Sequence, residues 1–426
     1  MHRDLHDVSV IGLGKLGSCM AATFALRGMN VVGIDINSEN VKAINDGRAP
    51  VHEPGLQELI DMAKPRLKAS VSHHAAANAD ASFFIPPTPS LPDGSFTNAF
   101  LLNAMRPVAK AVAMAGNKGH LFVCCSTTTP GAMEDVFVPM LEHETGWKCG
   151  VDFGLCYNPE FIALGDVIKG LLEPDVVLIG ESDHASGLRL STMYSTYCKN
   201  SPAISRMSLV SAELTKISVN AFVTMKISFT NQLQMISARF GNANIHDILR
   251  AVGADTRVGS KYLRAGVSFG GPCFPRDNRL LAYVATKVGV EAPLARATDH
   301  VNHLMKLSLL EQAKKHLTSD QDTTLVLGMA YKPKTHLVEE SAGLFIAQNL
   351  QRSGFCVMVH DFVSKASNSS ELSEFVELGD LGSLSNMPEI KVCIVCSPDP
   401  VYHSVVLHEN TFRIAPWDVS KRSDSV

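Results

Sequence analysis

The sequence predicts an α/β protein with two Rossmann-like parallel-sheet domains, joined by a central helical domain that contains one long helix. Three observations indicate this fold. A glycine-rich turn at residues 12–17 lies between two apolar runs, residues 203–240 contain no Gly or Pro, and strand-like apolar runs return after residue 323. We therefore expect domains over residues 1–200, 201–316 and 317–426.

The first domain begins as a βαβ unit. Val8–Ile11 is a short apolar run, a helical stretch over Ser18–Arg27 follows the turn, and Asn30–Ile34 is a second apolar run. Segments long enough for crossover helices separate the further strand-like runs, which are Ala81–Ile85, Leu121–Cys125 and Val176–Ile179. This spacing is typical of a parallel sheet covered on both faces.

The central domain contains the long helix. Ser208–Phe240 would form about 50 Å of helix at 1.5 Å per residue, and further helix is expected to about residue 316. Its apolar residues occupy more than one side, so we expect a homodimer formed through this helix. These residues are Leu214, Ile217, Phe222, Met225, Phe229 and Leu233. The third domain is predicted from the strand-like runs Thr324–Leu327, Cys356–Val359 and Val392–Cys396.

Composition and charge exclude several classes of protein. Hydrophobic residues make up 46% and charged residues 19%, which is ordinary globular usage. The net charge of −4 argues against nucleic acid as a partner. An uncharged apolar run of about 18 residues is missing, so no membrane span is expected. With 10 cysteines and no export signal, the sequence predicts reduced thiols and a cytoplasmic location.

The glycine-rich turn predicts a dinucleotide site. Gly12-Leu13-Gly14-Lys15-Leu16-Gly17 places backbone N–H groups and a helix N-terminus where they can hold a pyrophosphate. Asp35 ends the second apolar run, about where a carboxylate accepts the ribose hydroxyls. Because a carboxylate there repels a 2′-phosphate, NAD is favoured over NADP.

Two loops follow strands of the first domain, at the edge where open α/β sheets bind ligands. Pro87 and Thr88 belong to the loop at residues 86–89, and Thr127 and Thr128 to the hydroxyl-rich loop at 126–131. Pro87, Thr88 and Thr127 are candidate cofactor contacts. A purely rigid loop explains the prolines equally well, whereas the clustered hydroxyls favour contacts with cofactor or water.

Two further patterns could carry chemistry. Lys216 and Asn220 are four residues apart on the long helix and share a face, so they could polarise one oxygen; a solvated lysine is the alternative. Cys273 lies among glycines and prolines with Asp277 four residues later, which suits a nucleophile, although most free cysteines are structural. Cys393 and Cys396 have no second ligand pair, so we expect core residues and no metal site.

In this order, these residues resemble the UDP-glucose/GDP-mannose dehydrogenase family over nearly the whole chain. The matching segments are residues 12–17, 86–89, 126–131, 158–161, 216–220, 257–277 and 328–332. The resemblance implies an NAD-dependent, four-electron oxidation of the C6 alcohol of a nucleotide sugar to a carboxylate. UDP-glucose is the expected substrate and a UDP-N-acetylhexosamine the alternative.

The resemblance also implies catalytic roles. Cys273 would add to the intermediate aldehyde, and the thiohemiacetal would be oxidised to a thioester that water hydrolyses. Lys216 and Asn220 would stabilise the charged oxygen, and Asp277 would hold a water or orient Lys216. Glu160 would act as the base in hydrolysis and Thr128 would help to hold water. The residues implied to bind substrate are Phe161, Ile162, Arg257, Tyr262, Leu263, Phe269, Gly270 and Lys332, with Arg257 entering the neighbouring subunit's site.

Four positions depart from the family pattern, and they bear on substrate and cofactor preference. The family usually has Glu in place of Leu164 and Arg in place of Val176. It usually has Lys or Gln in place of Arg276, and Arg in place of Glu339. Two other functions remain open, because the helix with Lys216 and Asn220 also resembles that of β-hydroxyacid dehydrogenases, and because Leu164 and Glu339 suggest a protein without catalysis. A β-hydroxyacid dehydrogenase would perform a single two-electron step without a thiol, and a catalytically silent protein would bind UDP-sugars without forming NADH.

Overall fold

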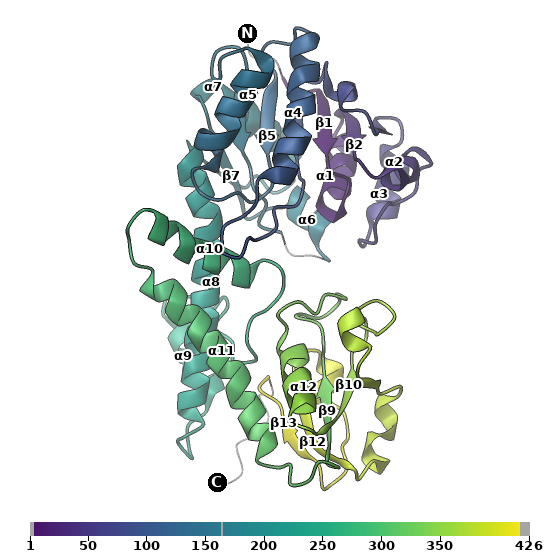
Figure 1. The fold of residues 1–426 in the computed structure, drawn as a ribbon, viewed down its shortest axis with the longest axis vertical. Helices are drawn as coiled ribbons and strands as arrows, with labels where there is room; N and C mark the ends of the chain where they lie inside the picture. The colour runs from purple at the N-terminus through teal and green to yellow at the C-terminus, as the bar shows by residue number, and fades with distance from the viewer. Residues whose placement is uncertain (1–3, 163–164, 418–426) are drawn as a thin grey trace. The chain divides into compact units, whose positions relative to one another are not determined.

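The computed structural model describes residues 4–162 and 165–417, and Leu164 lies outside them. The chain divides into two compact units, unit 1 over Met1–Ile217 and unit 2 over Ser218–Val426. Each unit has its own sheet of mostly parallel strands, as the fold class predicted (Figure 1). Each unit also has its own hydrophobic cores. Within the part of the chain that is described, no helix is long and apolar enough to cross a membrane.

Unit 1 is built on an eight-stranded sheet in the order β3-β2-β1-β4-β5-β6-β7-β8. Its strands are β1 (Asp7–Ile11), β2 (Asn30–Ile34), β3 (Leu67–Ser70), β4 (Ala81–Phe84), β5 (Leu121–Cys124), β6 (Gly154–Tyr157), β7 (Val176–Glu181) and β8 (Ala203–Ser208). Neighbouring strands are parallel except at β6 and β7, which pair antiparallel. The sheet therefore carries two reversed strands, β7 and β8, at one edge, and the second of these lies after residue 200.

Helices cover both faces of this sheet. They are α1 (Lys15–Leu26), α2 (Ser38–Asn45), α3 (Leu56–Ala63), α4 (Ala99–Met114), α5 (Val138–Thr145), α6 (Val167–Leu172) and α7 (His184–Tyr197). Alternate strand residues enter different cores: Phe83 packs in the core with α1, α3 and α7, whereas Phe84 packs in the core with α4 and α5. Because a strand's side chains alternate between faces, this separation shows that both faces are buried.

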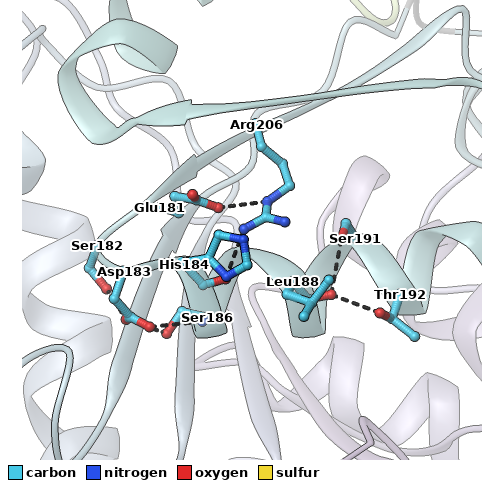
Figure 2. A network of polar contacts seen from close by, with 9 residues as sticks. All are labelled: Glu181, Ser182, Asp183, His184, Ser186, Leu188, Ser191, Thr192 and Arg206. Atoms are coloured by element: carbon cyan, nitrogen blue, oxygen red, sulfur yellow. Dashed lines mark hydrogen bonds and ion pairs between the residues drawn. The ribbon is translucent and has the colours of Figure 1, made fainter. Parts of the chain in front are cut away.

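A polar network joins β7, β8 and α7 at the reversed edge of the sheet (Figure 2). Asp183 caps α7 by accepting a hydrogen bond from the Ser186 amide at 3.0 Å. The Arg206 guanidinium on β8 donates to Glu181 on β7 at 2.8 Å. An added Cβ at Gly187 would lie 1.5 Å from a Glu181 carboxylate oxygen, so a larger residue there would require the Glu181 side chain to move away from α7.

Unit 2 contains the rest of the long helix and the second sheet. Helix α8 (Leu209–Ser237) begins in unit 1, and α9 (Ile245–Ala254), α10 (Phe274–Lys287), α11 (Pro293–Lys314), α12 (Ala342–Arg352) and α13 (Pro400–His403) follow. The sheet has the order β11-β10-β9-β12-β13 and is parallel throughout. Its strands are β9 (Thr323–Leu327), β10 (Cys356–His360), β11 (Val376–Glu377), β12 (Ile390–Val395) and β13 (Phe412–Ile414).

Candidate active site

The glycine turn after β1 is closed by backbone contacts. Gly12 has φ +99° and its N–H donates to the Ile34 carbonyl at 2.7 Å. A Cβ at Gly17 would lie 1.7 Å from the Gly12 carbonyl oxygen, so only glycine permits α1 to begin this close to the strand. Gly14 caps α1, and a Cβ there would meet nothing within 4 Å. The turn thus leaves open space at the N-terminus of α1, where a diphosphate can bind.

Asp35 is fixed at the end of β2 with its carboxylate partly exposed. Its Oδ2 accepts a hydrogen bond from the Leu13 amide at 2.6 Å, and its Oδ1 accepts one from the Asn37 amide at 2.8 Å. Oδ2 also accepts a longer bond from the Asn40 side chain at 3.4 Å, and Oδ1 can accept a second bond. Together with the open N-terminus of α1, these residues fit NAD, with Asp35 able to accept from the ribose hydroxyls.

The two loops predicted to contact the cofactor lie side by side at the ends of β4 and β5. The Thr88 hydroxyl donates to the Thr127 carbonyl at 2.7 Å, and the Ser126 hydroxyl donates to the Pro86 carbonyl at 2.5 Å. Pro87 is exposed and Thr127 partly exposed, whereas Thr88 is buried. The prolines therefore belong to a loop that side-chain hydrogen bonds also hold rigid.

Thr128 is buried, and its hydroxyl points to a carboxylate for which no role was predicted. Its hydroxyl donates to Glu213 Oε1 at 2.8 Å, while the amides of Gly131 and Met133 donate to Glu213 at 2.8 and 3.1 Å. Burial raises the pKa of Glu213 to about 7. The signal that could have revealed it is a carboxylate inside an otherwise apolar stretch, one turn before Lys216.

Lys216 and Glu160 lie together in unit 1. The Lys216 ammonium donates to the Glu160 carbonyl at 2.7 Å and lies 4.6 Å from the centre of the Phe161 ring. Burial raises the pKa of the Glu160 carboxyl to about 7, against the opposing charge of Lys216. Tyr194 supports this segment by donating to Asn158 at 2.5 Å. A carboxyl of this kind can accept a proton near neutral pH.

A pocket of about 310 Å³ lies beside Glu160 and is also lined by Phe161, Ile162 and Val176. The structure thus brings three predicted site residues to one cavity, together with one of the departures from the family pattern. Val176 presents an apolar side chain to this pocket where an arginine would add a charge. Asp166, Lys169, Glu173 and Asp175 complete the polar part of the lining.

Cys273 lies at the start of α10 in unit 2 and is exposed. Asp277, in the first turn of α10, is buried, and its amide donates to the Cys273 carbonyl at 2.9 Å. The Asn220 side chain donates to the Asp277 carboxylate at 2.6 Å. The N-terminus of a helix favours negative charge, so a thiolate nucleophile is well placed here. By contrast, Cys393 and Cys396 are buried, as expected of core residues.

The segment Phe269–Gly271, which precedes Cys273, is held by Asn302 at one end and packs against Tyr331 at the other. Asn302 accepts from the Phe269 amide at 2.8 Å and donates to the Phe269 carbonyl at 3.0 Å. Gly271 has φ +83°, and a Cβ there would lie 2.5 Å from the Tyr331 ring. Burial and the neighbouring Cys273 raise the pKa of Tyr331 to about 12. Lys332 follows Tyr331, with its ammonium 5.9 Å from the ring centre, so both predicted residues, Lys332 and Cys273, lie near Tyr331.

Comparison with known proteins decides the family. Residues 6–198 match the NAD-binding domain, and residues 210–304 the central domain, of the UDP-glucose/GDP-mannose dehydrogenase family. The chain is 33% identical over 361 residues to UDP-glucose 6-dehydrogenase AglM of Haloferax volcanii, with 84% of each chain covered. The chain belongs to the UDP-glucose/GDP-mannose dehydrogenase family. Its members are NAD-dependent nucleotide-sugar dehydrogenases, so the resemblance seen in the sequence and the NAD cofactor are confirmed.

Other relatives of this nucleotide-sugar dehydrogenase differ in their named substrates. GDP-mannose 6-dehydrogenase of Pseudomonas putida is 31% identical over 359 residues, covering 83% of this chain and 80% of its own. The solved structure of a UDP-glucose dehydrogenase from Pyrobaculum islandicum superposes with a TM-score of 0.88 at 32% identity, covering 98% of this chain and 95% of that one.

Three predicted substrate residues of this dehydrogenase lie in the loop after α9. Arg257 is exposed and pairs with Asp255 at 2.7 Å. Tyr262 has φ +64° and is half-exposed. Leu263 lines a second pocket, of about 350 Å³, together with residues of α9. The structure therefore places these three residues on one loop, and Leu263 shares its pocket with residues of α9.

The second sheet of the dehydrogenase has the same glycine turn after a strand as the first sheet. This second turn was not predicted from the sequence. Gly328 has φ +91°, and a Cβ at Gly343 would lie 2.3 Å from its carbonyl oxygen, as Gly17 would approach Gly12. Asp361 follows β10 and accepts from the Met329 and Ala330 amides at 2.8 and 3.0 Å. The signal was present in the sequence as a glycine after one strand and an aspartate after the next.

Proposed function

We propose that this dehydrogenase oxidises the C6 alcohol of UDP-glucose to the carboxylate, with Cys273 as the covalent nucleophile. The observation that carries the proposal is the exposed Cys273 at the N-terminus of α10, in the same helical turn as the Asp277–Asn220 hydrogen bond. The relatives from Haloferax volcanii and Pyrobaculum islandicum, both named UDP-glucose dehydrogenases, support the substrate.

NAD, when bound, supplies the hydride acceptor for each of the two oxidations. In the first, O6 loses a proton and C6 a hydride, while Lys216 and Asn220 stabilise the oxygen. The Cys273 sulfur then bonds to C6 of the aldehyde, and the thiol proton passes to the carbonyl oxygen. Loss of that proton and of a second hydride from C6 leaves a thioester. Water attacks the thioester, the S–C bond breaks, and the thiol and the carboxylate are formed.

Glu160 is proposed as the base that accepts a proton from the attacking water. Its raised pKa, about 7, suits proton transfer near neutral pH. Thr128 is proposed to hold a water molecule only by accepting a hydrogen bond from it. Because its only hydroxyl proton goes to Glu213, Thr128 can present only lone pairs to a water molecule.

The remaining site residues bind ligands in this proposal. Gly12, Gly14, Lys15, Leu16, Gly17, Asp35, Pro87, Thr88 and Thr127 would contact NAD. Phe161, Ile162, Arg257, Tyr262, Leu263, Phe269, Gly270 and Lys332 would contact the nucleotide sugar.

Within unit 2, α8 leaves Phe222, Phe229 and Ile236 exposed at intervals of seven residues. We propose that this face forms the homodimer. Light scattering would show a dimer that the change Phe229→Glu converts to a monomer.

GDP-mannose is the second candidate substrate, because the Pseudomonas putida relative is 31% identical over 359 residues. The test is a panel of UDP-glucose, UDP-N-acetylhexosamines and GDP-mannose, with NADH absorbance and a count of NADH formed per sugar. The proposal predicts the highest kcat/KM with UDP-glucose and two NADH per sugar. A higher kcat/KM with GDP-mannose would replace the substrate assignment.

Cysteine variants test the chemistry. Cys273→Ala should lower turnover by about three orders of magnitude or more, because a nucleophile that acts with its partners cannot be replaced by water. Cys356 is also exposed, so Cys356→Ala is the matched control and should keep full activity. Activity retained by Cys273→Ala, with one NADH per sugar, would indicate a two-electron enzyme. Tight UDP-sugar binding without NADH in the unmodified protein would indicate a silent binding protein.

A further inference from the structure

We infer that Glu213 is a positioning residue that fixes the loop at residues 126–131 to the start of α8, and so sets NAD affinity. The inference rests on the proposed function, in which Thr127 contacts NAD and Lys216 stabilises the reacting oxygen. Glu213 itself touches neither ligand in this proposal. It lies three residues before Lys216 on α8, so one side chain joins the loop to the helix turn of the lysine.

The contacts of Glu213 all go to one segment. Oε1 accepts from the Thr128 hydroxyl at 2.8 Å and from the Met133 amide at 3.1 Å, and Oε2 accepts from the Gly131 amide at 2.8 Å. The loop turns at Gly131, which has φ +94°, and continues into the π-helix Met133–Phe137. One carboxylate therefore holds both sides of the turn.

The start of α8 is itself rigid, so the loop is held against a fixed support. Leu209 and Ala212 belong to a buried core of unit 1. A Cβ at Gly180 on β7 would lie 2.8 Å from the Ala212 Cβ, which shows how closely α8 approaches the sheet. Movement of the loop thus requires that the Glu213 hydrogen bonds break.

Only an ionised carboxylate satisfies this arrangement. Three donors face Glu213, and a glutamine would turn an N–H group toward at least one of them. The charge of Glu134 opposes the ionisation of Glu213, and Glu213 in turn helps to raise the pKa of the buried Cys124 and Tyr157. Since burial raises the pKa of Glu213 to about 7, the loop should be held less firmly as the pH falls below neutral.

Amide hydrogen exchange of the ligand-free protein tests this without any turnover. In Glu213→Gln, the Gly131 and Met133 amides should exchange about tenfold faster, and calorimetry should show NADH binding about tenfold weaker. The KM for the nucleotide sugar should stay within about twofold. Thr128→Val added to Glu213→Gln should change NADH affinity little further, because both changes remove the same bond.

Glu134→Gln is the matched control, because it removes a neighbouring exposed carboxylate and keeps the three hydrogen bonds. It should shift the pH at which the two amides lose protection to a lower value, whereas a purely structural role predicts no shift. If Glu213→Gln fails to fold, the pH at which the Gly131 and Met133 amides lose protection can still be measured in the unmodified protein and compared with Glu134→Gln. Unchanged exchange and unchanged NADH affinity in Glu213→Gln would overturn the inference, and inactivity toward UDP-glucose alone would not affect it.

Discussion

The glycine turn gives a prediction in which two neighbouring glycines have opposite effects. In Gly17→Ala the new Cβ would start 1.7 Å from the Gly12 carbonyl oxygen, whereas in Gly14→Ala it would meet nothing within 4 Å. To reach an ordinary separation of 3.4 Å, the oxygen would have to move by about 1.7 Å within a closely packed turn. Gly12 resists that movement because its N–H is bonded to Ile34 at 2.7 Å.

The size of the effect follows from this clash. Overpacking against a rigid backbone costs about 3 kcal/mol, which lowers the melting temperature of a domain of this size by about 6–12 °C. Calorimetry of ligand-free Gly17→Ala should show that fall. Gly14→Ala should melt within about 2 °C of the unmodified protein, since only a helix cap changes. Its NADH affinity should fall about tenfold or more, because the methyl group occupies the space for the diphosphate.

Two outcomes would refute the reasoning. If Gly17→Ala melted like the unmodified protein, α1 could not begin as close to β1 as described. If Gly14→Ala lost as much stability as Gly17→Ala, the space at the N-terminus of α1 would not be open. Comparison of the two variants therefore separates the fold of the turn from its use in binding.

Three further predictions concern both units. Gly187→Ala should lower the free energy of unfolding by about 1 kcal/mol or less in urea, because its Cβ would lie 1.5 Å from a Glu181 carboxylate oxygen and that flexible side chain must move away from Arg206. Asn302→Leu should cost about 2–3 kcal/mol, because it removes both hydrogen bonds to the Phe269 backbone; an unchanged urea midpoint would contradict this role of Asn302. Since the pKa of Glu160 rises to about 7 on folding, the native state binds more protons than the unfolded state, so stability should fall from about pH 5 to pH 7. Glu160→Gln should flatten this fall.

Much of the fold could be predicted because its central strands are continuous apolar runs. The run Asn30–Ile34 is β2 to the residue, and the others agree within a few positions. Two of the missed strands have weak patterns: β3 is Leu-Lys-Ala-Ser, and β8, Ala-Ile-Ser-Arg-Met-Ser, runs into α8 without Gly or Pro. The other missed strands, β6, β11 and β13, have only two to four residues. The expected helix over 208–240 is therefore α8 over Leu209–Ser237, preceded by a strand. The reversal of β7 and β8 leaves no mark in the sequence.

Candidate site residues could be named from the sequence where the residue type itself suggests the chemistry. Cys273 stood apart from the other cysteines by its glycines and prolines, and it is exposed at a helix N-terminus. The hydrogen-bond partners of Glu213 and Asn302 were not predictable, because they include backbone groups far along the chain. Glu213 binds amides about 80 residues away, and Asn302 binds Phe269 across 33 residues. Hydrogen bonds of this kind have no local pattern.

The most direct measurement of the central claim is the mass of the Cys273 peptide during turnover. Glu160→Gln should slow thioester hydrolysis, so acid quenching after incubation with UDP-glucose and NAD should trap the sugar acid on Cys273. Peptide mapping should find that adduct on Cys273 and on no other cysteine, and Cys273→Ala should abolish it. NADH formation with Cys273 unmodified at every time point, or with the adduct on Cys356 instead, would contradict the account.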